Sequence, residues 1–174
     1  MKYLVDSDCF IGSCRDYYHN DVCPGFLPWV LRENGSGRVF STEHVRKELI
    51  DYEDGLATWA RGIGPDFFLP PDQATVAAMK EIAQWVVAEA RLLPTAKATY
   101  FSEKADQYLV GHAKAHGFCL VTCETSAPDS TRRLFIPDVC DANDVEWLPY
   151  YKFLRELKPG FVLPPDNWGD MGEI

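Results

Sequence analysis

The sequence predicts a single three-layer α/β/α domain around a central, mainly parallel sheet of four or five short strands. Short apolar runs alternate along the chain with longer segments whose apolar residues recur at helical spacing. This alternation is typical of a parallel sheet covered by helices on both faces. A length of 174 residues suits one domain, and a hydrophobic content of 47% excludes a disordered chain.

The expected strands are short and apolar. The run FCLVT is continuous and uninterrupted by charge, which is typical of a strand buried on both faces. The first strand ends in the acidic turn Asp6-Ser7-Asp8. The expected strands cover residues 2–5, 38–41, 118–122, 134–136 and 145–148.

Helical spacing defines the segments between these strands. Apolar residues from Phe10 to Tyr18 fall on one helical face, and Asp8 is the expected cap of that helix. Ser41 is the expected cap of a helix that carries Glu48. Further helices are expected around residues 26–31, 74–93, 102–116 and 150–157.

One domain accounts for most of the chain. We expect residues 1–157 to form it, with an all-helical insertion around 56–93 that is interrupted only between residues 62 and 71. Residues 158–174 are rich in Pro, Gly and Asp and are predicted to be a loose tail. No internal repeat argues for a second domain.

Charge and cysteine content restrict the classes of partner. The net charge of −9 disfavours nonspecific binding to nucleic acid or to an anionic membrane, and it leaves a metal site open. No apolar stretch reaches the length of a membrane span. We expect a cytoplasmic protein, without a membrane partner, whose six cysteines are reduced.

Acidic residues follow the predicted strands. Asp6 and Asp8 follow the first strand and Glu124 follows the strand at 118–122, while Glu48 and Asp106 lie on helices expected to begin at the same edge of the sheet. Carboxylates gathered there would repel one another, and burying each charge costs several kcal/mol. Mg²⁺ or Mn²⁺, which prefer oxygen ligands, would relieve the repulsion.

Three segments resemble the motifs of PIN-domain ribonucleases, the fold of the toxins in VapBC toxin–antitoxin pairs: VDSDCFI, VRKEL and ADQYLVGHAKAHGFCLVTCE. Within that family the chain is most similar to an uncharacterised prokaryotic PIN-like branch with YLVDSD near the start and IPDVC near the end. The resemblance implies an endoribonuclease dependent on Mg²⁺ or Mn²⁺. It implies that Asp6, Glu48, Asp106 and Glu124 are catalytic, that Asp6, Asp106 and Glu124 hold the metal, and that Thr122 supports them. Asp8, which follows the same strand as Asp6, is expected to support the site as well.

The resemblance also implies partners. RNA is the expected substrate, and an antitoxin protein and a second copy of the chain are the candidate protein partners. Glu124 departs from the family pattern, because small toxins usually have Asn or Asp there. Two other functions stay open: a haloacid-dehalogenase-like phosphatase that uses Asp6 and Asp8, and a non-catalytic PIN-like module that binds a basic partner.

Two further features have ordinary interpretations. His112 and His116 have the spacing of a zinc pair, but the residue after the first is Ala113 rather than Glu, so we expect surface histidines. The basic pairs Arg46-Lys47 and Arg132-Arg133 contact either a phosphate backbone or solvent.

Overall fold

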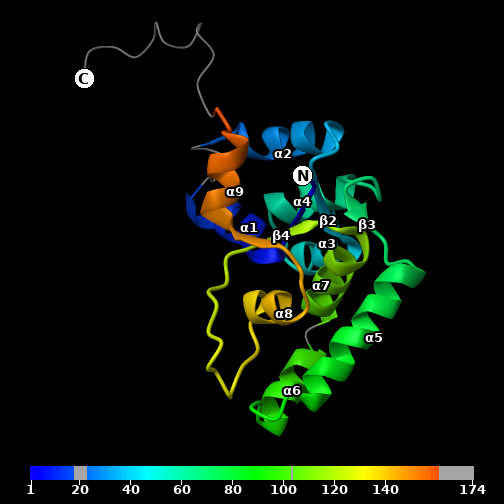
Figure 1. Ribbon diagram of the computed structural model, residues 1–174. Coiled ribbons are helices and arrows are strands. Elements are labelled where there is room, and N and C mark those ends of the chain that lie inside the picture. The colour runs from blue at the N-terminus through cyan, green and yellow to red at the C-terminus, as the bar shows by residue number, and fades with distance from the viewer. Residues whose placement is uncertain (18–22, 103, 161–174) are drawn as a thin grey trace, which may run out of the picture.

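The computed structural model describes residues 1–17, 23–102 and 104–160, and Figure 1 shows how its elements are arranged. The predicted α/β/α fold class is confirmed. Five parallel strands form a central sheet in the order β3-β2-β1-β4-β5. The strands are β1 (Tyr3–Val5), β2 (Val39–Thr42), β3 (Phe68–Leu69), β4 (Cys119–Thr122) and β5 (Trp147–Pro149).

Strand β1 occupies the centre of the sheet. Tyr3 lies opposite Val39 of β2 on one side and opposite Cys119 of β4 on the other. All three residues of β1 and all four of β4 are buried, as expected for strands covered on both faces. Because neighbouring strands run in the same direction, their carboxyl ends meet at one edge of the sheet.

Helices cover both faces of the sheet. Figure 1 shows α2 and α9 on one side and α5 and α7 on the other. Trp29 of α2 packs against Phe153 of α9 with ring centroids 5.9 Å apart, whereas α7 contacts β2 and β4 and packs against α5. The helices are α1 (Ser7–Gly12), α2 (Phe26–Gly35), α3 (Glu43–Ile50), α4 (Gly55–Gly62), α5 (Gln73–Ala88), α6 (Pro94–Ser102), α7 (Lys104–His116), α8 (Ile136–Ala142) and α9 (Tyr150–Leu157), and a π-helical turn covers Ser13–Tyr17.

Two strand predictions were wrong. The interruption at residues 62–71 is not merely a break between helices, because it contains β3, which pairs with β2 and is preceded by the buried Phe67. Residues 134–136 do not form a strand. Ile136 begins α8, and Pro137 lies in the first turn of that helix, where its missing N–H costs no hydrogen bond.

Several predicted boundaries also move. The helix expected at 74–93 ends at Ala88, and the helix expected from residue 102 begins at Lys104, after the separate helix α6. Tyr18 and residues 161–174 of the predicted tail lie outside the described residues. Within the described part of the chain, no helix combines the length and the apolar character that crossing a bilayer requires.

The surface position predicted for both histidines was wrong for His112. His112 is buried on α7, and its Nδ1 lies 3.1 Å from the hydroxyl oxygen of Thr75 on α5. Burial, followed by the nearby His116, lowers the pKa of His112 to about 4. His116 is exposed and lies 3.1 Å from Asp72. The pair therefore links α7 to the beginning of α5.

Gly111 permits the close packing of α7 on α5. A Cβ atom at this position would lie 2.4 Å from Cγ of Met79 and 3.3 Å from the carbonyl oxygen of Thr75. Helix α7 carries Asp106 in its first turn. The absence of a side chain at Gly111 thus helps to set the position of a candidate site residue.

We expect Gly111→Leu to lower the free energy of unfolding by about 1–3 kcal/mol, because a larger side chain would push the two helices apart. Gly62→Leu is the matched control, since a Cβ atom at this helical glycine meets nothing within 4 Å, and we expect a change within about 0.5 kcal/mol. Urea denaturation measures both. Equal effects at the two positions would contradict this account of α5–α7 packing.

Candidate functional site

A pocket of about 370 Å³ opens at the carboxyl edge of the sheet. All four predicted catalytic residues line it, and so does Asp8. The sequence analysis did not identify the other lining residues as part of a site, although it noted Arg133 as half of a basic pair. The acidic residues that line the pocket are Asp6, Asp8, Glu48, Asp51, Asp106 and Glu124, and the others are Ser7, Ile11, Tyr52, Arg133 and Ile136.

Asp6 is the most deeply buried of these acids, with 3% of its surface exposed. It follows β1 directly and caps α1, because its Oδ1 accepts a hydrogen bond from the Ser7 N–H at 2.7 Å. The hydroxyl group of Thr122 donates to its Oδ2 at 3.0 Å. The cap of this helix was predicted to be Asp8, which instead lies in the first turn of α1. Asp6 thus has a structural partner on each oxygen and still lines the pocket.

Electrostatics at Asp6 oppose its charged form. Burial, followed by the nearby carboxylate of Asp8, raises the pKa of Asp6 to about 7, and Glu124 adds to this shift. The hydrogen bonds from Thr122 and Ser7 act in the opposite direction but are outweighed. A positive charge in the pocket would therefore favour the ionised form of Asp6.

Glu48 and Asp106 line the pocket from two different helices, α3 and α7. Glu48 lies on α3, which is capped by Thr42 rather than by the predicted Ser41. The Ser41 hydroxyl group donates instead to the Val5 carbonyl oxygen at 2.7 Å and so ties β2 to β1. Asp106 lies in the first turn of α7. Both acids are partly buried.

Glu124 lines the pocket, but both of its oxygens already have partners. Its Oε1 lies 2.6 Å from Nη2 of Arg133, and its Oε2 accepts a hydrogen bond from the Ile136 N–H at 2.7 Å. Its own N–H donates to the hydroxyl oxygen of Thr122 at 3.1 Å. Among the described residues that line the pocket, Arg133 is the one basic side chain. Glu124 therefore holds the guanidinium group of Arg133 at the edge of the acidic pocket.

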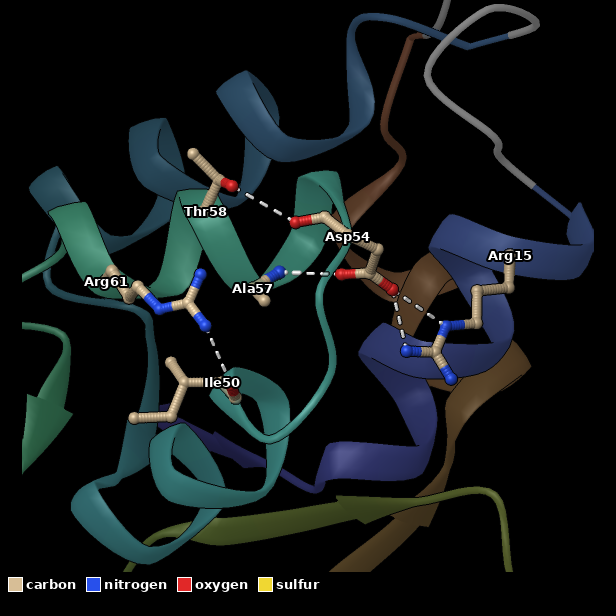
Figure 2. A network of polar contacts seen from close by, with 6 residues as sticks. All are labelled: Arg15, Ile50, Asp54, Ala57, Thr58 and Arg61. Atoms are coloured by element: carbon tan, nitrogen blue, oxygen red, sulfur yellow. Dashed lines mark hydrogen bonds and ion pairs between the residues drawn. The ribbon is translucent and has the colours of Figure 1, made fainter.

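A second network positions the segment after α3 that carries Asp51 and Tyr52. Figure 2 shows Arg15, on the π-helical turn, bound to the Asp54 carboxylate at 2.7 Å. Asp54 also caps α4 through the Ala57 N–H at 2.8 Å, the contact that does most to lower its pKa. Arg61 of α4 donates to the carbonyl oxygen of Ile50 at 3.0 Å. These contacts fix the ends of α3 and α4 next to the pocket.

The donor set is suited in its chemistry to an oxygen-ligated divalent cation. The acids supply carboxylate oxygens alone, which suits Mg²⁺ or Mn²⁺ better than a softer metal. As the side chains stand, no group of three His, Cys, Asp or Glu within the described ranges is disposed to hold a metal ion. The raised pKa of Asp6 is the observation that favours a cation here.

Comparison with known proteins identifies the family. The model of the domain of unknown function DUF4411 matches residues 3–161. The chain belongs to this family. The match covers every acid of the pocket and all five strands, so the DUF4411 domain coincides with the α/β/α fold described above. No curated protein matches the chain.

The raised pKa of Asp6 predicts a pH-dependent cost. The folded protein holds the Asp6 proton more tightly than the unfolded chain does, so wild type loses stability as the pH rises from about 4 through about 7. Without metal, Asp6→Asn should raise the free energy of unfolding at pH 8 by roughly 2–4 kcal/mol, with little effect near pH 4.

Urea denaturation in EDTA at both pH values measures this difference. Asp129→Asn, a substitution of an exposed loop residue, is the matched control and should change stability little at either pH. If Asp6→Asn clearly lowered the free energy of unfolding at pH 8, the charged carboxylate of Asp6 would stabilise the fold, which would contradict the expected cost of its charge.

Proposed function

We propose that this protein is a metal-dependent endoribonuclease whose acidic pocket holds Mg²⁺ or Mn²⁺ beside an RNA phosphodiester. The observation that carries the proposal is the convergence of Asp6, Glu48, Asp106 and Glu124, which come from distant parts of the chain, on one pocket at the carboxyl edge of a parallel sheet. The resemblance of the surrounding segments to PIN-domain ribonucleases supports RNA as the substrate.

Asp6, Glu48 and Asp106 are the residues that would hold the cation. When bound, the cation supplies a water of lowered pKa and stabilises the charge that develops on the transferred phosphoryl group. Asp8 adds negative charge at the mouth of the pocket and is a candidate for the outer ligand sphere. Thr122 orients Asp6 through its hydroxyl group, in the way that hydrogen bonds to ligating carboxylates usually do.

Glu124 and Arg133 act together at the other side of the pocket. The salt bridge with Arg133 already balances the charge of Glu124, and its second oxygen accepts a hydrogen bond from the Ile136 N–H. We assign it the role of holding Arg133 toward the pocket. Arg133 can then donate to the non-bridging oxygens of the phosphate, a contact for which a guanidinium group is well suited.

The proposal extends to location and partners by resemblance to the toxins of VapBC pairs. It places the protein in the cytoplasm, with an antitoxin protein or a second copy of the chain as its protein partner. The phosphatase alternative requires an aspartyl-phosphate on Asp6 or Asp8, and incubation with a phosphate monoester followed by mass spectrometry would detect it.

Asp6→Asn and Asp106→Asn should each reduce Mn²⁺-dependent cleavage of a fluorescent single-stranded RNA on the order of 100-fold or more. Even groups that only orient metal ligands are worth about 10–100-fold. The control is Asp66→Asn, which removes an exposed carboxylate that does not line the pocket and should leave cleavage unchanged. Cleavage that persists in EDTA, or in both pocket variants, would refute the metal-dependent mechanism.

Arg133→Ala should lower kcat/KM for RNA about 10–100-fold, because a charge-assisted hydrogen bond to phosphate is lost. It should leave the affinity for Mn²⁺ unchanged or tighter, since a positive charge leaves the pocket and Glu124 is released. Arg132→Ala, at the exposed neighbouring position, is the matched control. Weaker Mn²⁺ binding by Arg133→Ala, measured by calorimetry, would argue against the role given to this residue.

A further inference from the structure

Two cysteines from distant parts of the chain face each other next to the acidic pocket. Their Sγ atoms lie 3.5 Å apart, although Cys9 and Cys123 are 114 positions apart in the sequence. Cys9 lies on α1, one residue after Asp8, and Cys123 lies between the end of β4 and Glu124. Each cysteine is therefore adjacent to an acid that lines the pocket.

The backbone brings these two sulfur atoms together. Helix α1 contacts β4, and Sγ of Cys9 also lies 3.6 Å from the carbonyl oxygen of Val121. A disulfide needs an S–S distance of about 2.05 Å, so the sulfurs have to approach by about 1.5 Å. Rotation about the Cα–Cβ bonds of the two cysteines can supply movement of that size without a shift of α1 relative to β4.

The two thiols differ in their exposure to solvent, and this difference sets the order in which they react. Cys9 is buried, whereas Cys123 is exposed, and the other four cysteines are buried or partly buried. An external reagent can therefore reach Cys123 first. Cys9 is then the neighbouring thiol in position to displace whatever group is attached to the Cys123 sulfur.

We propose that Cys9 and Cys123 form a redox modification site, in which a small disulfide such as glutathione disulfide converts the two thiols into an intramolecular disulfide. The Cys123 thiolate attacks one sulfur of the reagent, a mixed disulfide forms, and one glutathione thiolate leaves. The Cys9 thiolate then attacks the Cys123 sulfur and expels the second glutathione. The protein loses two protons and two electrons, and these reduce the reagent to two glutathione thiols.

The disulfide would covalently link two segments that contribute residues to the acidic pocket. It joins α1, which is capped by Asp6 and carries Asp8 in its first turn, to the segment between Thr122 and Glu124. A bond that closes so long a loop also restricts the unfolded chain and stabilises the fold. The inference does not depend on the proposed ribonuclease activity, because neither cysteine takes part in that reaction.

Mass spectrometry tests the pairing directly. Wild type is incubated with glutathione disulfide, free thiols are blocked with iodoacetamide, and the protein is cleaved with trypsin. We expect a crosslinked product of residues 3–15 and 115–132 that separates after reduction with dithiothreitol. These peptides also contain Cys14 and Cys119. Cys14→Ser and Cys119→Ser should therefore keep the crosslink, whereas Cys9→Ser and Cys123→Ser should lose it.

Thermal denaturation gives a second readout that needs neither RNA nor metal. Oxidation should raise the Tm of wild type by roughly 5–10 °C, reversibly, and leave the Tm of Cys123→Ser unchanged. Because Cys123 is exposed, this variant is expected to fold. A glutathione adduct on Cys123 as the sole product, a dimer joined through Cys123, or a crosslink that persists in Cys9→Ser would each overturn the proposal.

Discussion

The hydrogen bond between Thr122 and Asp6 joins the end of the central strand β1 to the end of its neighbour β4, and the acidic pocket lies around it. The Thr122 hydroxyl group donates to Asp6 and accepts from the N–H of Glu124. A single buried hydroxyl thus orients the carboxylate after β1 and the turn after β4. The parallel pairing of β1 with β4 is what brings these groups within reach of each other.

The energetic balance at Asp6 explains why the pocket is suited to a cation. Hydrogen bonds from Ser7 and Thr122 favour the carboxylate, but burial and the neighbouring acids outweigh them. Among the described residues that line the pocket, the one basic side chain, Arg133, is bound to Glu124. The fold therefore keeps the Asp6 carboxylate buried near Asp8 and Glu124 at the expense of stability, which is a common feature of functional sites.

Much of this arrangement could be predicted from residue pattern alone. The apolar run FCLVT and the acids that follow the strands indicated a parallel sheet with Asp6, Glu48, Asp106 and Glu124 at one edge. Strand β3 was missed because two residues paired with a single neighbour leave little periodicity in the sequence. The strand predicted at 134–136 failed because a short apolar run does not distinguish a strand from the beginning of a helix, and Ile136 begins α8. The contact between Glu124 and Arg133 depends on the course of the loop between them, which no local pattern encodes.

The position of β1 has a consequence for how the protein is made. The central strand β1 comes before the other described strands in the chain, and the partner that completes its pairing, β4, is synthesised more than a hundred residues later. Contacts of such long sequence separation form slowly, because chain entropy must be lost before they stabilise anything. The acidic pocket therefore cannot assemble on a nascent fragment that lacks β4. It can be completed only after β4 and the lining residues that follow it, Glu124, Arg133 and Ile136, have emerged.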